Sequence, residues 1–539
     1  MDSEFNPALA VGAGILRLPN EILLEVLQLL DPADPGIFAL STSCRRLHYL
    51  VLPIYLAGYG IPDAPTLASQ DLTLLPGQLD VLGALQTALF LSNSSLKHIA
   101  CSFSLNSARP AYHSRNLDGF FRHIRKLAGF LSILERVDEV TLDFKDLNFW
   151  VIGESIGVLE SWNSAISALL DVILERHCQT LKVEGGMFMV HPSQFQRKPQ
   201  ALATVKRRSV IYDVGRRIGS AFVGKADAQP IFDSGKPQGG LRTFNIHSRV
   251  LLLHPCFSWT MAALSASPNL TSLSIIRVEI PERSWDDILT SIHVPTLEYL
   301  SIDLRSKIRP AALDQFLARH PLLTTLNLGR DLAPLAEGDV ASKDCLRNLT
   351  NLSASPTYVR FLLADKRVAP AVRNVRLLVK VTSHATFDAA SINETLAPCH
   401  VRLDSGHGVQ LTLVIMVDYP SSHWAGFFAE EAHDNGSSSA PSPRRGANPD
   451  PLRCARALEM VSTRPSNAFE ALALRWLPSF PALKALSFSG CLVNAHFDYN
   501  ALSFVRCVRD ACPNVRTVTL DGRVYDAVAV GMDGPLSWM

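Results

Sequence analysis

The chain has 539 residues, of which 47% are hydrophobic and 19% charged, and its 51 basic and 50 acidic side chains give a formal net charge of +1. This composition excludes disordered and fibrous proteins, and the near-neutral balance gives no overall attraction to nucleic acid or acidic membranes. The length exceeds what one compact core organises, so we expect several modules or one elongated repeat array.

The N-terminus and the cysteines set the expected compartment. Residues 1–15 lack the basic segment and apolar core of a secretory signal, and the apolar stretch 49–61 is too short to cross a bilayer. The ten cysteines include no CxxC pair, which argues against a disulfide framework and a zinc site. We therefore expect an intracellular protein, cytoplasmic or nuclear, with reduced and mostly buried thiols, no cofactor, no metal and no membrane partner.

The first predicted element is a helix over residues 20–30, which starts after Pro19 because proline is tolerated in a first helical turn. Three polar residues fall at i, i+4 and i+7 and form one narrow polar stripe, namely Glu21, Glu25 and Gln28. The remaining circumference is apolar, so the helix needs partners on two sides. Its own domain supplies one side, and we expect a second protein to supply the other.

The following residues extend this helix into a small unit. A turn rich in proline and glycine precedes a short apolar segment around Phe38, and Cys44-Arg45-Arg46-Leu47 leads into another apolar stretch. The pattern predicts a three-helix unit of about forty-five residues, which buries little core by itself and is therefore expected to dock on a partner.

This unit resembles an F-box, whose usual phrase is leucine-proline, an acidic residue with isoleucine, leucines at helical spacing and a cysteine-arginine pair before an apolar residue. The resemblance covers residues 15–56. One departure is Leu47, because many F-boxes carry tryptophan after the arginines. The matching residues are Leu18-Pro19, Glu21-Ile22, Leu27, Leu30, Leu40, Ser41 and Cys44-Arg45-Arg46-Leu47.

The resemblance implies that these helices bind a Skp-type adaptor, which attaches the protein to a cullin-RING ubiquitin ligase. The implied adaptor-binding residues are Leu18, Pro19, Ile22, Leu23, Val26, Leu27, Leu30, Leu40, Cys44 and Leu47. An alternative is a cap, in which the helices pack only on the C-terminal body of the same chain.

Beyond a connector at 57–90, the phrase L-x-x-L-x-L recurs with helix-like segments between its copies. Its first leucines in the clearest copies are Leu270, Leu297, Leu323 and Leu349, at steps of 27, 26 and 26 residues. Further copies start near residues 96, 137, 178, 241, 483 and 515. Alternating strand and helix at this period is the signature of leucine-rich repeats, because one unit cannot bury its leucine face alone. An ordinary α/β domain with leucine-rich strands is the alternative.

The predicted fold is therefore α/β: an N-terminal three-helix F-box at 15–56, followed by an irregular leucine-rich-repeat solenoid over 91–530, similar to fungal F-box proteins with leucine-rich repeats. Two insertions interrupt the solenoid. Residues 191–240 include eight basic residues and one acid between Arg197 and Lys225, and we interpret them as a solvated insertion rather than a nucleic-acid site. Residues 432–452 are rich in serine and proline and are interpreted as a loop.

Catalytic motifs are weak. Residues 219–226, GSAFVGKA, lack the serine or threonine that a phosphate-binding loop needs after lysine. No GxSxG or HExxH sequence occurs. Three histidine positions stand apart from any catalytic motif: His177 beside Cys178, His400 beside Cys399, and His407. A triad assembled from distant positions stays open as a hydrolase hypothesis.

The leading prediction is a non-catalytic substrate receptor of a ubiquitin ligase complex, which recruits an unknown protein for ubiquitination by protein-protein interaction. Strand residues between the leucines are the candidates for the target-binding face: Ser274, Ile276, Ser301, Asp303, Asn327, Ser487 and Asp521. The alternatives are a leucine-rich scaffold without a ligase role and the hydrolase.

Overall fold

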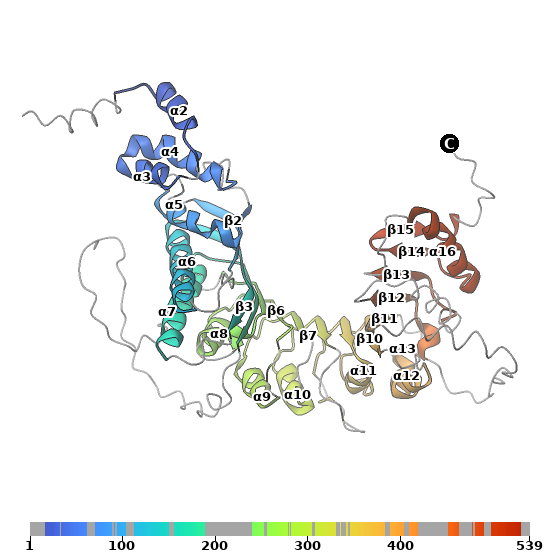
Figure 1. The fold of residues 1–539 in the computed structure, drawn as a ribbon. Helices are drawn as coiled ribbons and strands as arrows, with labels where there is room; N and C mark the ends of the chain where they lie inside the picture. Colours follow the sequence, from blue (N-terminus) through green and yellow to red (C-terminus); the bar gives the residue numbers. More distant parts are fainter. Residues whose placement is uncertain are drawn as a thin grey trace, which may run out of the picture. The chain divides into compact units, whose positions relative to one another are not determined.

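The structure is a computed structural model with a mixed α/β fold (Figure 1). It describes residues 17–32, 34–61, 71–88, 91, 94–103, 113–149, 156–188, 240–252, 256–278, 280, 282–303, 308–329, 335, 341–342, 345–382, 389–403, 409–418, 451–462, 477, 480–489 and 497–529. The chain divides into two compact units, residues 1–273 and residues 274–539, which we describe separately. The basic insertion, the sequence GSAFVGKA and most of the serine-rich stretch lie outside the described residues.

Unit 1 begins with the predicted three helices, α2 (Asn20–Gln28), α3 (Pro35–Ser43) and α4 (Arg45–Gly58). Pro19 occupies the N-cap of α2, and its carbonyl accepts a hydrogen bond from the Leu23 N–H at 3.1 Å. The Asp34 side chain caps α3 by accepting a hydrogen bond from the Gly36 N–H at 2.7 Å. A tilted ring contact between Phe38 and Tyr55, with ring centroids 5.4 Å apart, joins α3 to α4.

The rest of unit 1 is a sheet of parallel strands in chain order. The strands are β1 (Asp71–Leu74), β2 (Ser95–Ser102), β3 (Arg136–Phe149), β4 (Thr180–Phe188) and β5 (Thr243–His247). The helices are η2 (Pro76–Val81), α5 (Leu82–Thr87), α6 (His113–Ile133), α7 (Ile156–Glu175), η7 (Arg249–Leu252) and α8 (Phe257–Ser265). In Figure 1, α6 and α7 lie on one face of the strands.

Strand β6 (Ser272–Ile276) spans the boundary, and unit 2 continues in chain order. Its strands are β7 (Tyr299–Asp303), β8 (Thr325–Leu328), β9 (Asn351–Ala354), β10 (Asn374–Thr382), β11 (Gln410–Asp418), β12 (Ala457–Ser462), β13 (Ala485–Ser489), β14 (Thr517–Leu520) and β15 (Arg523–Asp526). Its helices are α9 (Glu282–Ser291), α10 (Pro310–Ala318), α11 (Pro356–Leu363), α12 (Ala389–Leu396), η8 (Ala397–Cys399), α13 (His400–Leu403), η10 (Pro451–Cys454) and α16 (Phe497–Ala511). Among the described strand pairs of unit 2, neighbouring strands run parallel except β14 and β15, which are antiparallel.

Six of the predicted phrases form the same local structure, namely those that start at Leu270, Leu297, Leu323, Leu349, Leu483 and Val515. The first apolar residue ends a tight turn, as when the Leu323 N–H donates to the His320 carbonyl at 3.3 Å. The N–H of the next residue donates to the carbonyl of the equivalent residue just before the preceding strand. The Thr324 N–H donates to the Glu298 carbonyl, and the Thr350 N–H to the Thr324 carbonyl, both at 2.8 Å. This bond sets neighbouring strands in register, so the apolar positions of successive phrases align.

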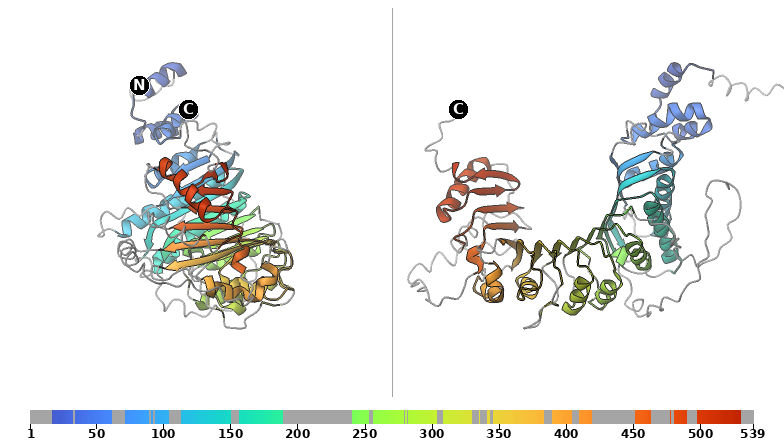
Figure 2. Two further views of the ribbon diagram at one scale, coloured as in Figure 1. Left: turned by 90° about the vertical axis from the view of Figure 1, so that its right-hand side faces the viewer. Right: turned by 180° about the vertical axis from the view of Figure 1, so that it is seen from behind.

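Side chains alternate between the two faces of the sheet in unit 2. Leu300, Leu326 and Leu352 pair in register and are fully buried, at 0%, 0% and 1% exposed. The residues that follow them pair on the opposite face, namely Ser301, Asn327 and Ser353. Helices α9 to α12 lie along one side of the strands (Figures 1 and 2). The core of unit 2 therefore lies between the leucine face of its sheet and these helices.

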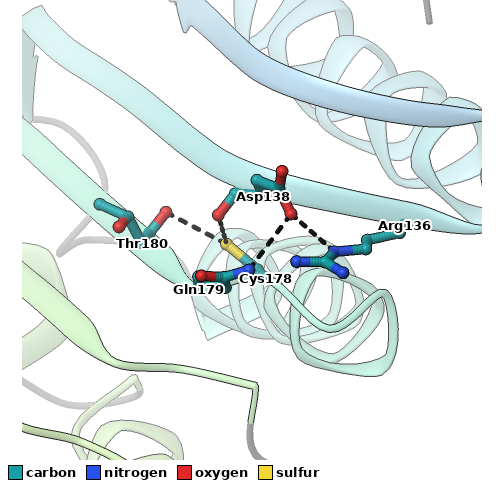
Figure 3. Close-up of polar contacts among 5 residues, drawn as sticks. All are labelled: Arg136, Asp138, Cys178, Gln179 and Thr180. Atoms are coloured by element: carbon teal, nitrogen blue, oxygen red, sulfur yellow. Dashed lines mark hydrogen bonds and ion pairs between the residues drawn. The ribbon is translucent and has the colours of Figure 1, made fainter. Parts of the chain in front are cut away.

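The step between β3 and β4 shows how side chains support the register (Figure 3). The Gln179 N–H donates to the Asp138 carbonyl at 2.8 Å, and the Arg136 guanidinium donates to the Asp138 carboxylate at 2.6 Å. The Cys178 thiol donates to the Thr180 carbonyl at 3.1 Å. Burial raises the pKa of this thiol to about 12, so it stays protonated as the donor requires.

The sheet begins earlier than the sequence predicts. Strand β1 lies within the expected connector 57–90 and pairs in parallel with β2, so the sheet starts at Asp71 rather than after residue 90. Four residues carry too few periodic positions to distinguish a strand from a loop, which explains the difference.

Two findings concern the described helices and cysteines. No helix among the described residues has the length and apolar character that crossing a bilayer requires. All nine described cysteines are free, and six of them are buried: Cys101, Cys178, Cys256, Cys345, Cys399 and Cys512.

A buried histidine makes unit 2 sensitive to acid. His320 is fully buried, donates from Nδ1 to the Phe316 carbonyl at 2.7 Å and accepts from the Val294 N–H through Nε2 at 3.2 Å. Burial lowers its pKa from 6.5 to about 4. The unfolded chain therefore binds a proton between these values that the folded chain does not, so stability is complete above pH 6.5 and falls as the pH drops toward 4.

We expect His320 to cost about 2 kcal/mol of stability at pH 5 relative to pH 7. The His320→Gln variant, whose amide also donates and accepts, is expected to lose less stability over this interval. Urea unfolding of both proteins at the two pH values measures the difference. Equal pH dependence in wild type and variant would show that His320 is not the responsible group.

Candidate functional site

Helix α2 carries three distinct stripes along its length. Leu23 and Leu27 are 3% and 5% exposed and pack toward α4. The predicted polar stripe, Glu21, Glu25 and Gln28, is exposed to solvent. A third stripe at i, i+4 and i+7 is apolar and also exposed: Ile22 at 42%, Val26 at 49% and Leu29 at 87%. The described chain thus covers only one of the two apolar sides that the sequence predicts.

Other large apolar residues of the three helices are exposed as well. We define the apolar surface as Leu18, Pro19, Ile22, Val26, Leu29, Leu30 and Leu40. Scattered single apolar residues are common on protein surfaces, whereas a gathering within one small helical unit is typical of an interaction site. The apolar surface is the candidate site for a protein partner.

The ten predicted adaptor-binding residues separate into two groups. Six belong to the apolar surface: Leu18, Pro19, Ile22, Val26, Leu30 and Leu40. Leu23, Leu27 and Leu47 are buried inside the three-helix unit, and Cys44 is half-buried at the N-cap of α4. In the free chain, the buried residues therefore form the core of the unit beneath the apolar surface.

Arg46 connects the start of α2 to α4. Its Nε donates to the Asn20 side-chain oxygen at 2.8 Å, and its Nη2 donates to the Leu18 carbonyl. These bonds fix the segment that carries Leu18 and Pro19. The neighbouring Arg45 is exposed and lies over the Tyr49 ring, 5.9 Å from its centroid, so it takes no part in this connection.

Sequence reasoning did not assign roles to Leu29 and Arg46. The signal for Leu29 was present, because it lies seven residues after Ile22 and three after Val26 on the exposed stripe. The bonds of Arg46 join residues 26 and 28 positions apart, and no local pattern reveals such a long-range contact.

The predicted target-binding residues lie on strands or at strand ends, with different exposure. Ser274 and Ser301 are buried at 5% and 4%, whereas Ile276 and Ser487 are half-exposed. The Asn327 side chain is half-exposed and donates to the Tyr299 hydroxyl at 2.9 Å. Asp303 ends β7.

Asp521 does not lie on a strand face, contrary to the prediction. It forms with Gly522 the turn between antiparallel β14 and β15, and both residues have positive φ, 43° and 88°. Asp-Gly favours this two-residue turn because both positions need left-handed backbone angles. The Asp521 side chain is therefore set by hairpin geometry.

Displaced pKa values in the described residues have structural causes. Burial raises the pKa of Asp171, whose carboxylate accepts a hydrogen bond from Trp259 Nε1 at 2.7 Å. This contact joins α7 to α8, and His320 has the two backbone partners described above. Within the described part of the chain, no group of three or more His, Cys, Asp or Glu side chains is arranged to hold a metal ion.

Comparison with known families identifies one module. The family model described as the F-box domain matches residues 15–54, which contain α2, α3 and most of α4. F-box domains in general bind Skp-type adaptors in cullin-RING ubiquitin ligases, and proteins that carry them are typically non-catalytic substrate receptors. No curated protein matches the chain.

Proposed function

We propose that this chain, with an F-box domain at residues 15–54, is the substrate-recognition subunit of a cullin-RING ubiquitin ligase. The single observation that carries the proposal is the exposed apolar stripe of α2 inside the matched region, Ile22, Val26 and Leu29. An adaptor helix that covers this stripe buries apolar area that the chain leaves in water. The residues we assign to adaptor contact are those of the apolar surface.

The second part of the proposal concerns the body of the chain. We infer that the strands and helices after residue 70 form an irregular leucine-rich-repeat solenoid that binds a target protein. The strand order along the chain, the parallel pairing and the repeated backbone bond between equivalent phrase positions support this inference. Half-exposed polar residues of the sheet, such as Asn327 and Ser487, are candidates for target contact.

On this proposal the chain itself performs no chemistry. It holds a target close to the ubiquitin-transferring enzyme that the cullin-RING partner recruits, and this proximity raises the effective concentration of the reacting groups. Its partners are a Skp-type adaptor, the cullin-RING ligase attached to that adaptor, and an unidentified target protein in the cytoplasm or nucleus.

The scaffold alternative makes the three helices a cap on the body. A cap would bury the apolar side of α2 against the sheet, but α2 packs on α4 and exposes Ile22, Val26 and Leu29. The three helices are joined to the rest of unit 1 by the end of α4, where Gln78 Nε2 of η2 donates to the Tyr59 carbonyl at 2.8 Å. The exposure of the apolar stripe of α2 supports the receptor proposal over the scaffold.

Assembly of the ligase tests the proposal. We expect the purified chain to co-elute with a cullin-RING complex on size-exclusion chromatography only when a Skp-type adaptor is added. Co-elution without the adaptor, or none with it, would contradict the proposed arrangement.

Arg46 gives a specific prediction about the adaptor surface. Arg46→Ala removes the bonds to Asn20 and Leu18, so the Leu18-Pro19 segment loses its fixed position before binding. We expect the affinity for the adaptor to fall by roughly fivefold, about 1 kcal/mol. Titration calorimetry measures the change, and Arg45→Ala is the matched control with unchanged affinity. An equal loss of adaptor affinity in both variants would show that the positive charge matters, rather than the fixed position of the Leu18-Pro19 segment.

A further inference from the structure

Three neighbouring strands of unit 2 carry a basic residue at the same position. Before β12, β13 and β14, a buried apolar residue (Ala455, Leu483 or Val515) is followed directly by a basic one. We define the basic edge as Arg456, Lys484 and Arg516. Figure 1 shows the three strands stacked next to one another near the C-terminal end of the unit.

Backbone hydrogen bonds place the three basic residues side by side. The Lys484 N–H donates to the Arg456 carbonyl, and the Arg516 N–H donates to the Lys484 carbonyl, each at 2.8 Å. Residues joined in this way lie at the starts of adjacent strands, which are about 4.8 Å apart in a sheet. The three side chains therefore start from one line along the edge where the strands begin.

The positive charge of the basic edge is not compensated within the described residues. Lys484 and Arg516 are exposed and Arg456 is half-buried, and none of the three forms an ion pair with another described residue. Asp526, on the adjoining strand β15, instead accepts the N–H groups of Val528 and Ala529 at 2.8 and 3.2 Å.

Glu459 on β12 does not neutralise the basic edge either, because its carboxylate forms an ion pair with Arg376. Like charges on adjacent strands repel, so the edge gains stability when an anion binds.

The repeated fold does not by itself require basic residues at this position. The equivalent residues before β7, β8 and β9 are Glu298, Thr324 and Thr350, and they make the same backbone bonds. The position therefore tolerates acidic and neutral side chains, and the run of three cations is a local property of β12 to β14.

We propose that the basic edge binds an acidic segment of a partner polypeptide through aspartate and glutamate carboxylates. Charge complementarity is the argument, because three adjacent unpaired cations match a run of carboxylates and attract it at long range. The further step, that the acidic segment belongs to a target of the ligase, rests on the receptor function proposed above. The binding itself does not depend on that function and can be measured without the adaptor.

Fluorescence anisotropy of the full chain tests the proposal, with a labelled decapeptide of glutamates as the probe. The edge variant is Arg456→Gln/Lys484→Gln/Arg516→Gln. The control Lys366→Gln/Arg367→Gln/Arg506→Gln removes the same charge from exposed residues outside the edge. We expect affinity to fall at least tenfold in the edge variant and less than twofold in the control.

Three outcomes would overturn the assignment: no binding by wild type, equal binding by the edge variant, or an equal loss in the control. A tenfold preference for a phosphoserine peptide of equal charge would overturn the carboxylate ligand and assign phosphate. If the edge variant misfolds by circular dichroism, Arg456→Lys/Arg516→Lys keeps the charge and is expected to bind within threefold of wild type. Binding to the Skp-type adaptor, measured in parallel, should be unchanged in the edge variant, so failure of the receptor function is detected separately.

Discussion

Replacing Ile22 and Val26 with aspartate is expected to weaken binding to a Skp-type adaptor at least a hundredfold. Both side chains lie on the exposed apolar stripe of α2, at 42% and 49% exposed, so the free protein tolerates the change. In the complex, the two carboxylates would lose water without gaining partners, and this desolvation is strongly unfavourable. Titration calorimetry with the purified adaptor measures the loss.

The polar stripe of the same helix supplies the matched control. Glu25→Ala/Gln28→Ala changes two exposed residues of α2 that lie on a different side from Ile22 and Val26. We expect adaptor affinity within a factor of three of wild type. If the aspartate variant bound as tightly as this control, the apolar stripe would not be the adaptor site.

Leu326→Ala is expected to destabilise unit 2 by about 2–5 kcal/mol, the cost of removing a fully buried leucine and leaving a cavity. Leu326 is 0% exposed and pairs in register with Leu300 and Leu352, so the surrounding core has little freedom to close the space. Urea unfolding monitored by circular dichroism measures the change.

The adjacent residue tests the alternation of the two faces. The Asn327 side chain is similar in size to that of Leu326, but it is half-exposed and has one described hydrogen-bond partner, the Tyr299 hydroxyl. Asn327→Ala removes this side chain. We expect a cost near 1 kcal/mol or less. Equal destabilisation by the two substitutions would contradict the assignment of Leu326 to the buried core and of Asn327 to the opposite, half-exposed side of the strand.

The sequence predicted the elements of the N-terminal unit well and their exposure less well. Apolar periodicity located α2 and its polar stripe, since both depend only on spacing along one helix. It could not separate Leu23 and Leu27, which form the core, from Ile22 and Val26, which face solvent. That division depends on where α4 packs, a contact between residues distant in the chain.

The repeated phrases were also predictable, because every copy requires the same buried positions. The strands over 272–276, 299–303 and 325–328 coincide with predicted copies, and α9 and α10 lie between them as expected. The face residues were harder to predict. Ser301 is buried although it is polar, and Asp521 belongs to a hairpin turn that its Asp-Gly sequence favours. The basic edge emerged only when the backbone bonds aligned Arg456, Lys484 and Arg516.

The most direct test is titration of the purified full chain with a purified Skp-type adaptor, together with the Leu18→Ala/Pro19→Ala variant. We expect one-to-one binding by wild type and strongly reduced binding by the variant, because both residues belong to the exposed apolar surface that Arg46 holds in place. Absence of binding by a well-folded wild-type chain would contradict the receptor function and leave the scaffold alternative, with the exposed side of α2 assigned to another partner.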